Sequence, residues 1–269
     1  MPQALETINT YGTGDNSATT LSHVADPSQS LAIRSSNGNP SAQLFGIWAM
    51  MGIAADLAIF SPRMHDDVHG IQTRVQVSKT DPVYDYDFQQ PMYSQDTPTV
   101  QSTFGSAPGS SVAEQAGYNI YYTDLPGISA NLMSWAQVEP QIISFYGVKV
   151  SCVSSATAGA LGAGSAINSV YDNFKANSKY ALLGYNVNVE CGNVSIQGSD
   201  TGNLQVGGPG SIAEIETRRY FCDISQATGL ALIPVINSAN KASTNVFVSH
   251  TTASTTVIVD LLFAYLGPM

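Results

Sequence analysis

Polar and apolar residues alternate along many short stretches of the chain, and turn residues separate these stretches. Residues 71–77 place apolar and threonine side chains on one face and charged or amide side chains on the other. The segment 255–266 alternates in the same way and stops at Gly267-Pro268. A period of two is typical of half-buried β-strands, and many short strands separated by turns indicate a sandwich or a barrel. We therefore predict an all-β fold.

The apolar stretch at residues 42–59 is ambiguous when it is read by itself. Periodicity alone does not separate a buried helix from buried strands in such a stretch, and its Met and Ala residues favour a helix. A second stretch helps, because Leu44-Phe45-Gly46-Ile47 is matched by Leu182-Leu183-Gly184-Tyr185. The second copy continues with a clear strand alternation from Tyr185 to Cys191. We therefore predict strands in both copies.

This match belongs to a longer repeat whose blocks keep the same order in both halves of the chain. Asp56-Leu57-Ala58-Ile59 is matched by Asn193-Val194-Ser195-Ile196, and a turn-rich stretch that closes on glycine follows each copy. Further on, Tyr121-Tyr122-Thr123-Asp124-Leu125 is matched by Tyr220-Phe221-Cys222-Asp223-Ile224. A long repeat that occurs only twice is not a solenoid, whose units are shorter and more numerous. It predicts two similar β-domains in tandem.

The polar, turn-rich and small-residue stretches divide the chain into four expected segments. The stretch from Ser78 to Gly117 carries four prolines and has no counterpart in the second copy, so we expect it to be an insert that forms an outer protrusion. The expected segments are an N-terminal arm at 1–41, a first barrel at 42–154 with the insert at 78–117, a linker at 155–178 and a second barrel at 179–269.

The composition is poor in charge, and this bears on function. Charged residues make up 11% of the chain, against about 25% in an average soluble protein. A surface with so few charges fits a protein that covers much of itself with neighbours, although a secreted β-protein with a hydroxyl-rich surface has the same composition. The net charge of −10, with only 10 Lys and Arg residues, argues against direct nucleic-acid binding, which depends on basic side chains.

Targeting and redox signals are sparse. The N-terminal residues have no basic region followed by an apolar one, so we expect no secretory signal, and synthesis and assembly in the cytoplasm. No apolar run reaches the roughly 18–20 residues of a membrane span. The three cysteines, Cys152, Cys191 and Cys222, have neither a CxxC nor a metal-binding spacing, so we expect reduced and partly buried thiols.

The densest group of metal-ligand side chains is His65-Asp66-Asp67-Val68-His69. Two His four residues apart share a helix face and bind a metal in some enzymes, but Pro62 and Gly70 bracket the segment and argue against a helix. A solvent-facing turn is the simpler interpretation, with His65, Asp66, Asp67 and His69 as weak metal candidates. The acidic residues of the insert, Asp81, Asp85, Asp87 and Asp96, lack the glycine and glutamate of an EF-hand loop.

No catalytic motif is present. No serine lies in G-x-S-x-G, and the glycines at 202–210 lack the lysine and the following helix of a phosphate loop. His23 and His250 are isolated. We therefore predict that the chain is not an enzyme and expect no catalytic residue and no cofactor.

With its two repeat copies and its terminal strand at 257–267, the chain resembles the double jelly-roll major capsid proteins of icosahedral, tailless viruses. The resemblance covers most of residues 42–267 as architecture, not as a signature motif, and the chain is short for that family. It implies two tandem jelly-roll-like domains, homotrimers that form pseudo-hexameric capsomers, contacts with other virion proteins and a location in the virion. The arm would bridge neighbouring subunits or face the interior of the shell.

Two other functions remain open at this point. A tandem β-sandwich binding module, such as a lectin, an adhesin or a virion spike, would explain the hydroxyl-rich strands and the aromatic residues Tyr84, Tyr86, Phe88 and Tyr93 of the insert. A metal-dependent enzyme would use the group at His65–His69. Particle size discriminates among these functions, because a shell protein assembles in large copy number.

Overall fold

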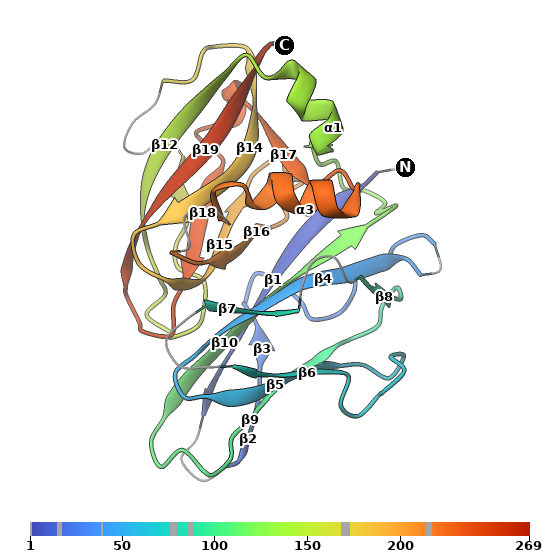
Figure 1. Ribbon diagram of the computed structural model, residues 1–269, viewed down its shortest axis with the longest axis vertical. Coiled ribbons are helices and arrows are strands. Elements are labelled where there is room, and N and C mark those ends of the chain that lie inside the picture. Colours follow the sequence, from blue (N-terminus) through green and yellow to red (C-terminus); the bar gives the residue numbers. More distant parts are fainter. Residues whose placement is uncertain are drawn as a thin grey trace.

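The computed structural model describes residues 2–14, 18–38, 40–75, 80–84, 89–167, 173–212 and 217–269, with the backbone alone at 80–84. The chain is all-β, as predicted, and the described residues form four antiparallel sheets. The sheets are stacked along the long axis of the molecule and are numbered here from the bottom of the view in Figure 1 to its top.

Sheets 1 and 2 form the half of the molecule that contains the N-terminal strands. Sheet 1 has the spatial order β2 (Thr20–Ser22), β9 (Thr99–Thr103), β5 (Ala55–Phe60) and β6 (Ile71–Val75). Sheet 2 has the order β3 (Val24–Ala25), β1 (Ala4–Gly14), β10 (Val112–Tyr122), β4 (Ala42–Met51) and β7 (Thr80–Tyr84), with β8 (Gln90–Met92) also paired to β4.

Sheets 3 and 4 form the other half. Sheet 3 has the order β13 (Ser165–Ala166), β18 (Asn245–Ser249), β15 (Cys191–Gln197) and β16 (Val206–Gly210). Sheet 4 has the order β11 (Leu132–Met133), β17 (Ile233–Asn237), β14 (Ser178–Val187), β19 (Thr256–Pro268) and β12 (Ser144–Val153).

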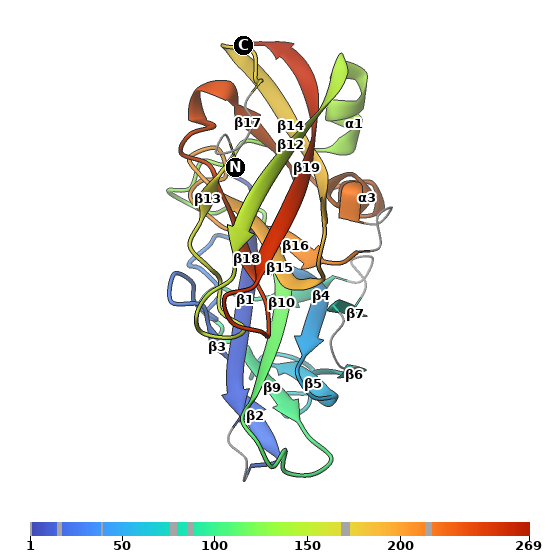
Figure 2. The ribbon, with the colours of Figure 1, turned by 90° about the vertical axis from the view of Figure 1, so that its left-hand side faces the viewer.

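The helices lie beside sheet 4. Helix α3 (Tyr220–Thr228) packs on β14 and β17 and ends at Gly229, whose φ of 70° suits the left-handed cap of a helix. The others are short: α1 (Trp135–Val138) and the 3₁₀ turns η1 (Glu139–Gln141) and η2 (Ser238–Asn240). Figure 2 shows α1 and α3 on the same side of the molecule. Within the described part of the chain, no helix has the length and apolarity needed to cross a bilayer.

The two halves share one order of strands in space. Among the described residues, each half has eight corresponding strands when β3, β8 and β11 are left out. Sheets 2 and 4 then both place these strands in the order first, eighth, third, sixth, and sheets 1 and 3 both place them in the order second, seventh, fourth, fifth. The repeated segments at Leu44 and Leu182 lie in the third strands, and those at Asp56 and Asn193 lie in the fourth. The strands predicted in both copies are therefore confirmed.

Each pair of facing sheets encloses its own core. Ile8, Leu57 and Ile120 belong to the core between sheets 1 and 2, and Val194 and Phe263 belong to the core between sheets 3 and 4. All five are at most 1% exposed, and full burial of one such side chain stabilises a fold by about 1.5–3 kcal/mol. We call these two units the first and the second sandwich.

The prediction of an N-terminal arm at 1–41 was wrong. β1 pairs with β10 from Ala4↔Tyr122 to Gly14↔Val112 and is buried over nearly its whole length. The polar residues of β1 made it resemble a loosely ordered segment. It is a buried strand instead, because other parts of the chain cover both of its faces. Ile8 points into the first sandwich, whereas Thr7 and Asn9 point at the second, where they have hydrogen-bond partners.

The predicted insert at 78–117 is also not a single irregular stretch. It contains β7, β8, β9 and the first half of β10, and β7 and β9 hold the same places in the strand order as β17 and β18 of the second sandwich. Residues 85–88, which include the acidic and aromatic centre of the insert, lie outside the described residues.

Two further boundaries differ from the prediction. The last strand within the expected first barrel at 42–154 is β12, which pairs with β19 over its whole length and so belongs to the second sandwich. The expected linker at 155–178 contains β13, which pairs with β18.

One block of the sequence repeat was matched wrongly. The block Tyr220–Ile224 lies in α3 and is no counterpart of the strand segment at Tyr121, because it packs as a helix on sheet 4.

Candidate functional site

The turn with the four metal candidates lies between β5 and β6 and is exposed. It brings two of them together, because His69 Nδ1 lies 3.2 Å from Asp66 Oδ2. The backbone N–H groups of His69 and Val68 donate to Asp66 Oδ1 and thereby lower the pKa of the Asp66 carboxyl. This side chain closes its own turn, as Asp commonly does. No group of three or more His, Cys, Asp or Glu suited to a metal ion occurs among the described residues.

Other sequence candidates have structural partners. Asp96 is buried and accepts hydrogen bonds from Ser61 Oγ at 2.7 Å and from the Thr97 N–H at 3.0 Å. None of the three cysteines forms a disulfide, and all three are buried. Burial raises the pKa of the Cys152 thiol to about 11 and that of Cys222 to about 12, so neither forms the reactive thiolate at neutral pH.

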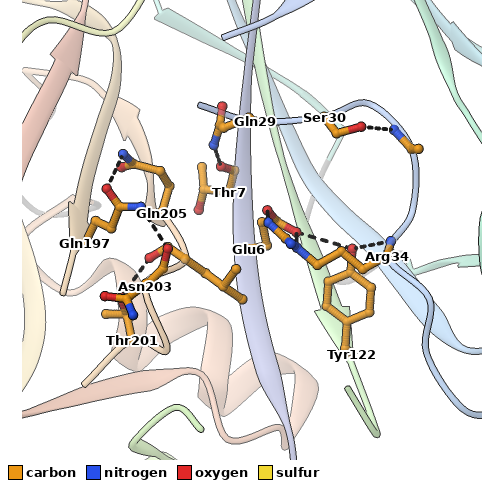
Figure 3. A network of polar contacts seen from close by, with 12 residues as sticks. Glu6, Thr7, Gln29, Ser30, Arg34, Tyr122, Gln197, Thr201, Asn203 and Gln205 are labelled. Atoms are coloured by element: carbon orange, nitrogen blue, oxygen red, sulfur yellow. Dashed lines mark hydrogen bonds and ion pairs between the residues drawn. The ribbon is translucent and has the colours of Figure 1, made fainter. Parts of the chain in front are cut away.

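A hollow of about 410 Å³ opens beside β1, next to the buried carboxylate of Glu6. Arg34 donates two hydrogen bonds to this carboxylate, from Nε at 2.7 Å and from Nη2 at 2.6 Å (Figure 3). The Tyr122 hydroxyl donates to Glu6 Oε2 and accepts from the Arg34 N–H. The hydrogen bond to Glu6 raises the pKa of Arg34. The two charges satisfy each other, so this cluster fastens residues 30–35 to β1 and presents no net charge to a ligand.

The contact between the sandwiches is a network of buried polar side chains centred on β1. The Thr7 hydroxyl accepts a hydrogen bond from the Gly207 N–H and donates one to Asn119 Oδ1, both at 2.7 Å. Asn119 Nδ2 in turn donates to the Tyr220 hydroxyl at 2.7 Å. These bonds join β1 and β10 of sheet 2 to β16 and α3 of the second sandwich.

Asn9 makes a second group of contacts further along β1. Its Nδ2 donates to the Gly159 carbonyl at 3.0 Å, and its Oδ1 accepts from Gln115 Nε2 at 2.7 Å and from Ser249 Oγ at 2.9 Å. Asn9, Gln115 and Ser249 are all 0% exposed. Hydrogen bonds between side chains that are shielded from solvent are strong and directional. These bonds therefore hold the two sandwiches in one relative position.

Two titratable groups lie inside the first sandwich. His23 is held between Ser102 Oγ at 2.8 Å and Thr10 Oγ1 at 3.3 Å, and burial lowers its pKa to about 4. Glu114 accepts a hydrogen bond from the Ile53 N–H at 3.1 Å, and burial raises its pKa to about 8. Its Oε2 atom has no partner among the described residues. Both groups are therefore held neutral at pH 7.

One face of sheet 4 combines exposure with apolar side chains. It is formed by the outward residues of β12 and β19, and we call it the β12/β19 face. Its residues are Phe145, Gly147, Lys149, Ser151, Val153, Thr256, Ile258, Asp260, Leu262, Ala264 and Leu266. Phe145 is 64% exposed and Val153 is 47% exposed, whereas α3 packs on the neighbouring strand β14. Phe145 and Val153 lie near opposite ends of β12, with the ion pair of Lys149 and Asp260 between them, so the face mixes exposed apolar and charged side chains.

The sequence prediction missed this face, although the chain carries a signal for it. In residues 144–153 the inward positions Val148, Val150 and Cys152 alternate as expected, yet Phe145 and Val153 place apolar side chains on the outward side as well. A strand that is apolar on both faces is typically covered on both.

No protein-family model matches the chain, and no curated protein matches its sequence.

Proposed function

We propose that this chain is the structural subunit of an icosahedral shell, a major capsid protein built from two tandem jelly rolls. The observation that carries the proposal is the strand order, which is the same in both sandwiches. Eight antiparallel strands in two facing sheets are the composition of a jelly roll, a fold that viral capsid proteins use.

The buried network at Thr7 and Asn9 supports the proposal. A shell subunit needs its two domains in a fixed relative position, because each domain must meet a different neighbour in the lattice. A flexible tandem of binding domains would have a small interface, whereas here sheet 2 is buried on both of its faces. Three copies of such a rigid pair would supply six similar sandwiches to one pseudo-hexameric capsomer.

The surface composition points in the same direction. Interfaces between permanent subunits are large and more apolar than ordinary surface, and each unpaired charge buried there costs free energy. A chain with 11% charged residues avoids that cost over much of its surface. The β12/β19 face offers an apolar surface of the kind that such a contact would bury.

The decisive experiment measures the size of the native particle. Purified protein is analysed by multi-angle light scattering over a range of concentrations, and electron micrographs are taken of the same sample. Megadalton shells, or trimers that tile into sheets, are the expected result. A monodisperse monomer or small oligomer at every concentration would overturn the proposal and favour a glycan-binding module, which a glycan array would then test.

A further inference from the structure

The repeat allows each position on sheet 2 to be matched to one on sheet 4. Leu44 of β4 pairs with Ile120, and its repeat partner Leu182 of β14 pairs with Phe263. The next positions, Tyr121 and Ala264, are therefore equivalent. Because Tyr121 pairs with Leu5 and Ala264 pairs with Phe145, Leu5 and Phe145 occupy the same place in the two sandwiches.

Equivalent positions on the two sheets differ sharply in exposure. Leu5 is 0% exposed and Phe145 is 64% exposed. Thr7, two residues beyond Leu5, is fully buried, yet a Cβ atom added at its counterpart Gly147 would meet nothing within 4 Å. The outer face of sheet 2 is thus covered within the chain at β1, whereas the matching positions of the edge strand β12 are open. In the next strand, β19, Ala264 is as fully buried as its counterpart Tyr121, so the open part of sheet 4 lies along β12.

What covers sheet 2 is the outer face of sheet 3, through contacts such as that of Ser249 Oγ with Asn9 Oδ1 at 2.9 Å. Sheet 1 is the counterpart of sheet 3, and its outer face lies free at the far end of the stack (Figure 1). Asn193 pairs with Ser249 in sheet 3, as Asp56 pairs with Thr103 in sheet 1. In the part of the chain that the structure describes, one surface of each kind therefore lies uncovered.

Each of the two unused surfaces carries one ion pair. On the β12/β19 face, Lys149 lies 3.9 Å from Asp260. On the outer face of sheet 1, Arg74 lies 3.2 Å from Asp56. By the register of the repeat, Lys149 is the counterpart of Asn9, and Thr103 is the counterpart of Ser249. Lys149 of one copy would therefore face Thr103 and the adjacent Asp56 of the next copy.

We propose that a second copy of this chain packs the outer face of its sheet 1 on the β12/β19 face, as sheet 3 packs on sheet 2 within the chain. This proposal rests on the proposed function in one respect, since both require self-association, and it adds which surfaces meet. The contact is head-to-tail, so repetition of it closes a ring or extends a chain of subunits.

Disulfide cross-linking tests the pairing, because the three native cysteines are buried. The double variant Lys149→Cys with Thr103→Cys places one thiol on each surface. Mild oxidation of the purified oligomer should give a ladder of cross-linked dimers, trimers and larger species. A reducing agent should abolish this ladder. Each single variant should give no cross-link. Absence of the ladder in the oxidised double variant would overturn the pairing, as would dimers from Lys149→Cys alone, which would show a face-to-face contact.

A charge placed on the surface tests its energetic role. Phe145→Arg is tolerated by the fold because Phe145 is exposed, and it should raise the concentration required for self-association by about tenfold or more. Val68→Arg is the matched control at a turn residue that is 62% exposed and lies outside both surfaces. If both variants require the same concentration for self-association, the proposal is contradicted.

The outcomes separate this inference from the proposed function. Shells in the micrographs without the cross-link would overturn the pairing and leave the shell function standing. Cross-linked rings or chains that never form shells would support the pairing and overturn the shell function.

Discussion

Trp48 and Gly192 lie 144 residues apart in the chain, yet the indole Nε1 of Trp48 donates a 2.7 Å hydrogen bond to the carbonyl oxygen of Gly192. The bond joins β4 of sheet 2 to β15 of sheet 3. A Cβ atom at Gly117 would come within 2.5 Å of the same indole ring, so a glycine is needed beside it. The two sandwiches are thus joined by directed contacts and not by apolar surface alone.

Trp48→Phe should destabilise the chain by about 1–3 kcal/mol, because it leaves a buried carbonyl oxygen without a donor. Denaturation in urea, followed by circular dichroism, measures the change. Trp135→Phe, in the half-buried helix α1, is the matched control. It should lower the free energy of unfolding by less than Trp48→Phe does. Equal unfolding free energies for Trp48→Phe and the wild type would contradict the role given to this bond.

Thr7→Val tests the other end of the same interface. Valine has nearly the shape of threonine, so the change removes the hydroxyl and leaves the Gly207 N–H and Asn119 Oδ1 without their partner. Each buried polar group left in this way costs about 1–3 kcal/mol. Thr13→Val, at an exposed position of the same strand, should be nearly neutral. The midpoint temperatures of thermal unfolding of both variants measure the difference. Similar midpoints for the two would argue against a buried network at Thr7.

These contacts also explain which parts of the fold the sequence could predict. β14, β15 and β19 of the second sandwich each have one face in the apolar core, and their alternation is readable from residues such as Val257 and Val259. The sequence repeat then identified β4 and β5. Both faces of β1 are buried, one against apolar and one against polar neighbours, so Thr7 and Asn9 made it look like an exposed segment.

The candidate surface was harder to predict for a different reason. A sequence pattern shows that Phe145 is apolar, but it does not show whether a neighbour in the same chain covers it. Only the register of β12 with β19 identifies Phe145 as the counterpart of Leu5, and only the stacking of the sheets shows that one of the two is covered. Such information lies in contacts between distant strands.

The buried carboxyl of Glu114 should make stability depend on pH. Its pKa is raised by burial from 4.5 to about 8, so the folded state holds a proton that the unfolded state loses. This contribution is fully present below pH 4.5 and is lost as the pH rises to about 8, with a slope of at most about 1.4 kcal/mol per pH unit. Unfolding free energies measured from pH 4.5 to 9 should show this decline.

Glu114→Gln is the control for that pH dependence. The amide is neutral at every pH and keeps an oxygen for the Ile53 N–H, so the decline between pH 4.5 and 8 should disappear. If the variant retains the full slope, another group is responsible and Glu114 is not held protonated in the folded chain.

Gln29 protects the outer edge of β1, and this gives the last prediction. Its Nε2 donates to the Thr7 carbonyl at 2.5 Å, and its Oε1 accepts from the Asn9 N–H at 2.8 Å. The side-chain amide thereby takes the place of a peptide group from a neighbouring strand. Gln29→Ala should lower the free energy of unfolding by about 1–2 kcal/mol. It should also favour aggregation, because it exposes unpaired backbone groups at the edge of β1.

Gln29→Glu sharpens this test, because a carboxylate still accepts from Asn9 but meets the Thr7 carbonyl oxygen with a like charge. The variant should therefore be less stable than Gln29→Ala at pH 7. It should recover near pH 4, where a glutamate side chain gains the proton that it needs to donate. Melting temperatures of both variants at the two pH values, each referred to the wild type, measure the effect. A Gln29→Glu variant whose deficit does not shrink at pH 4 would show that the amide is not a required donor at this edge of β1.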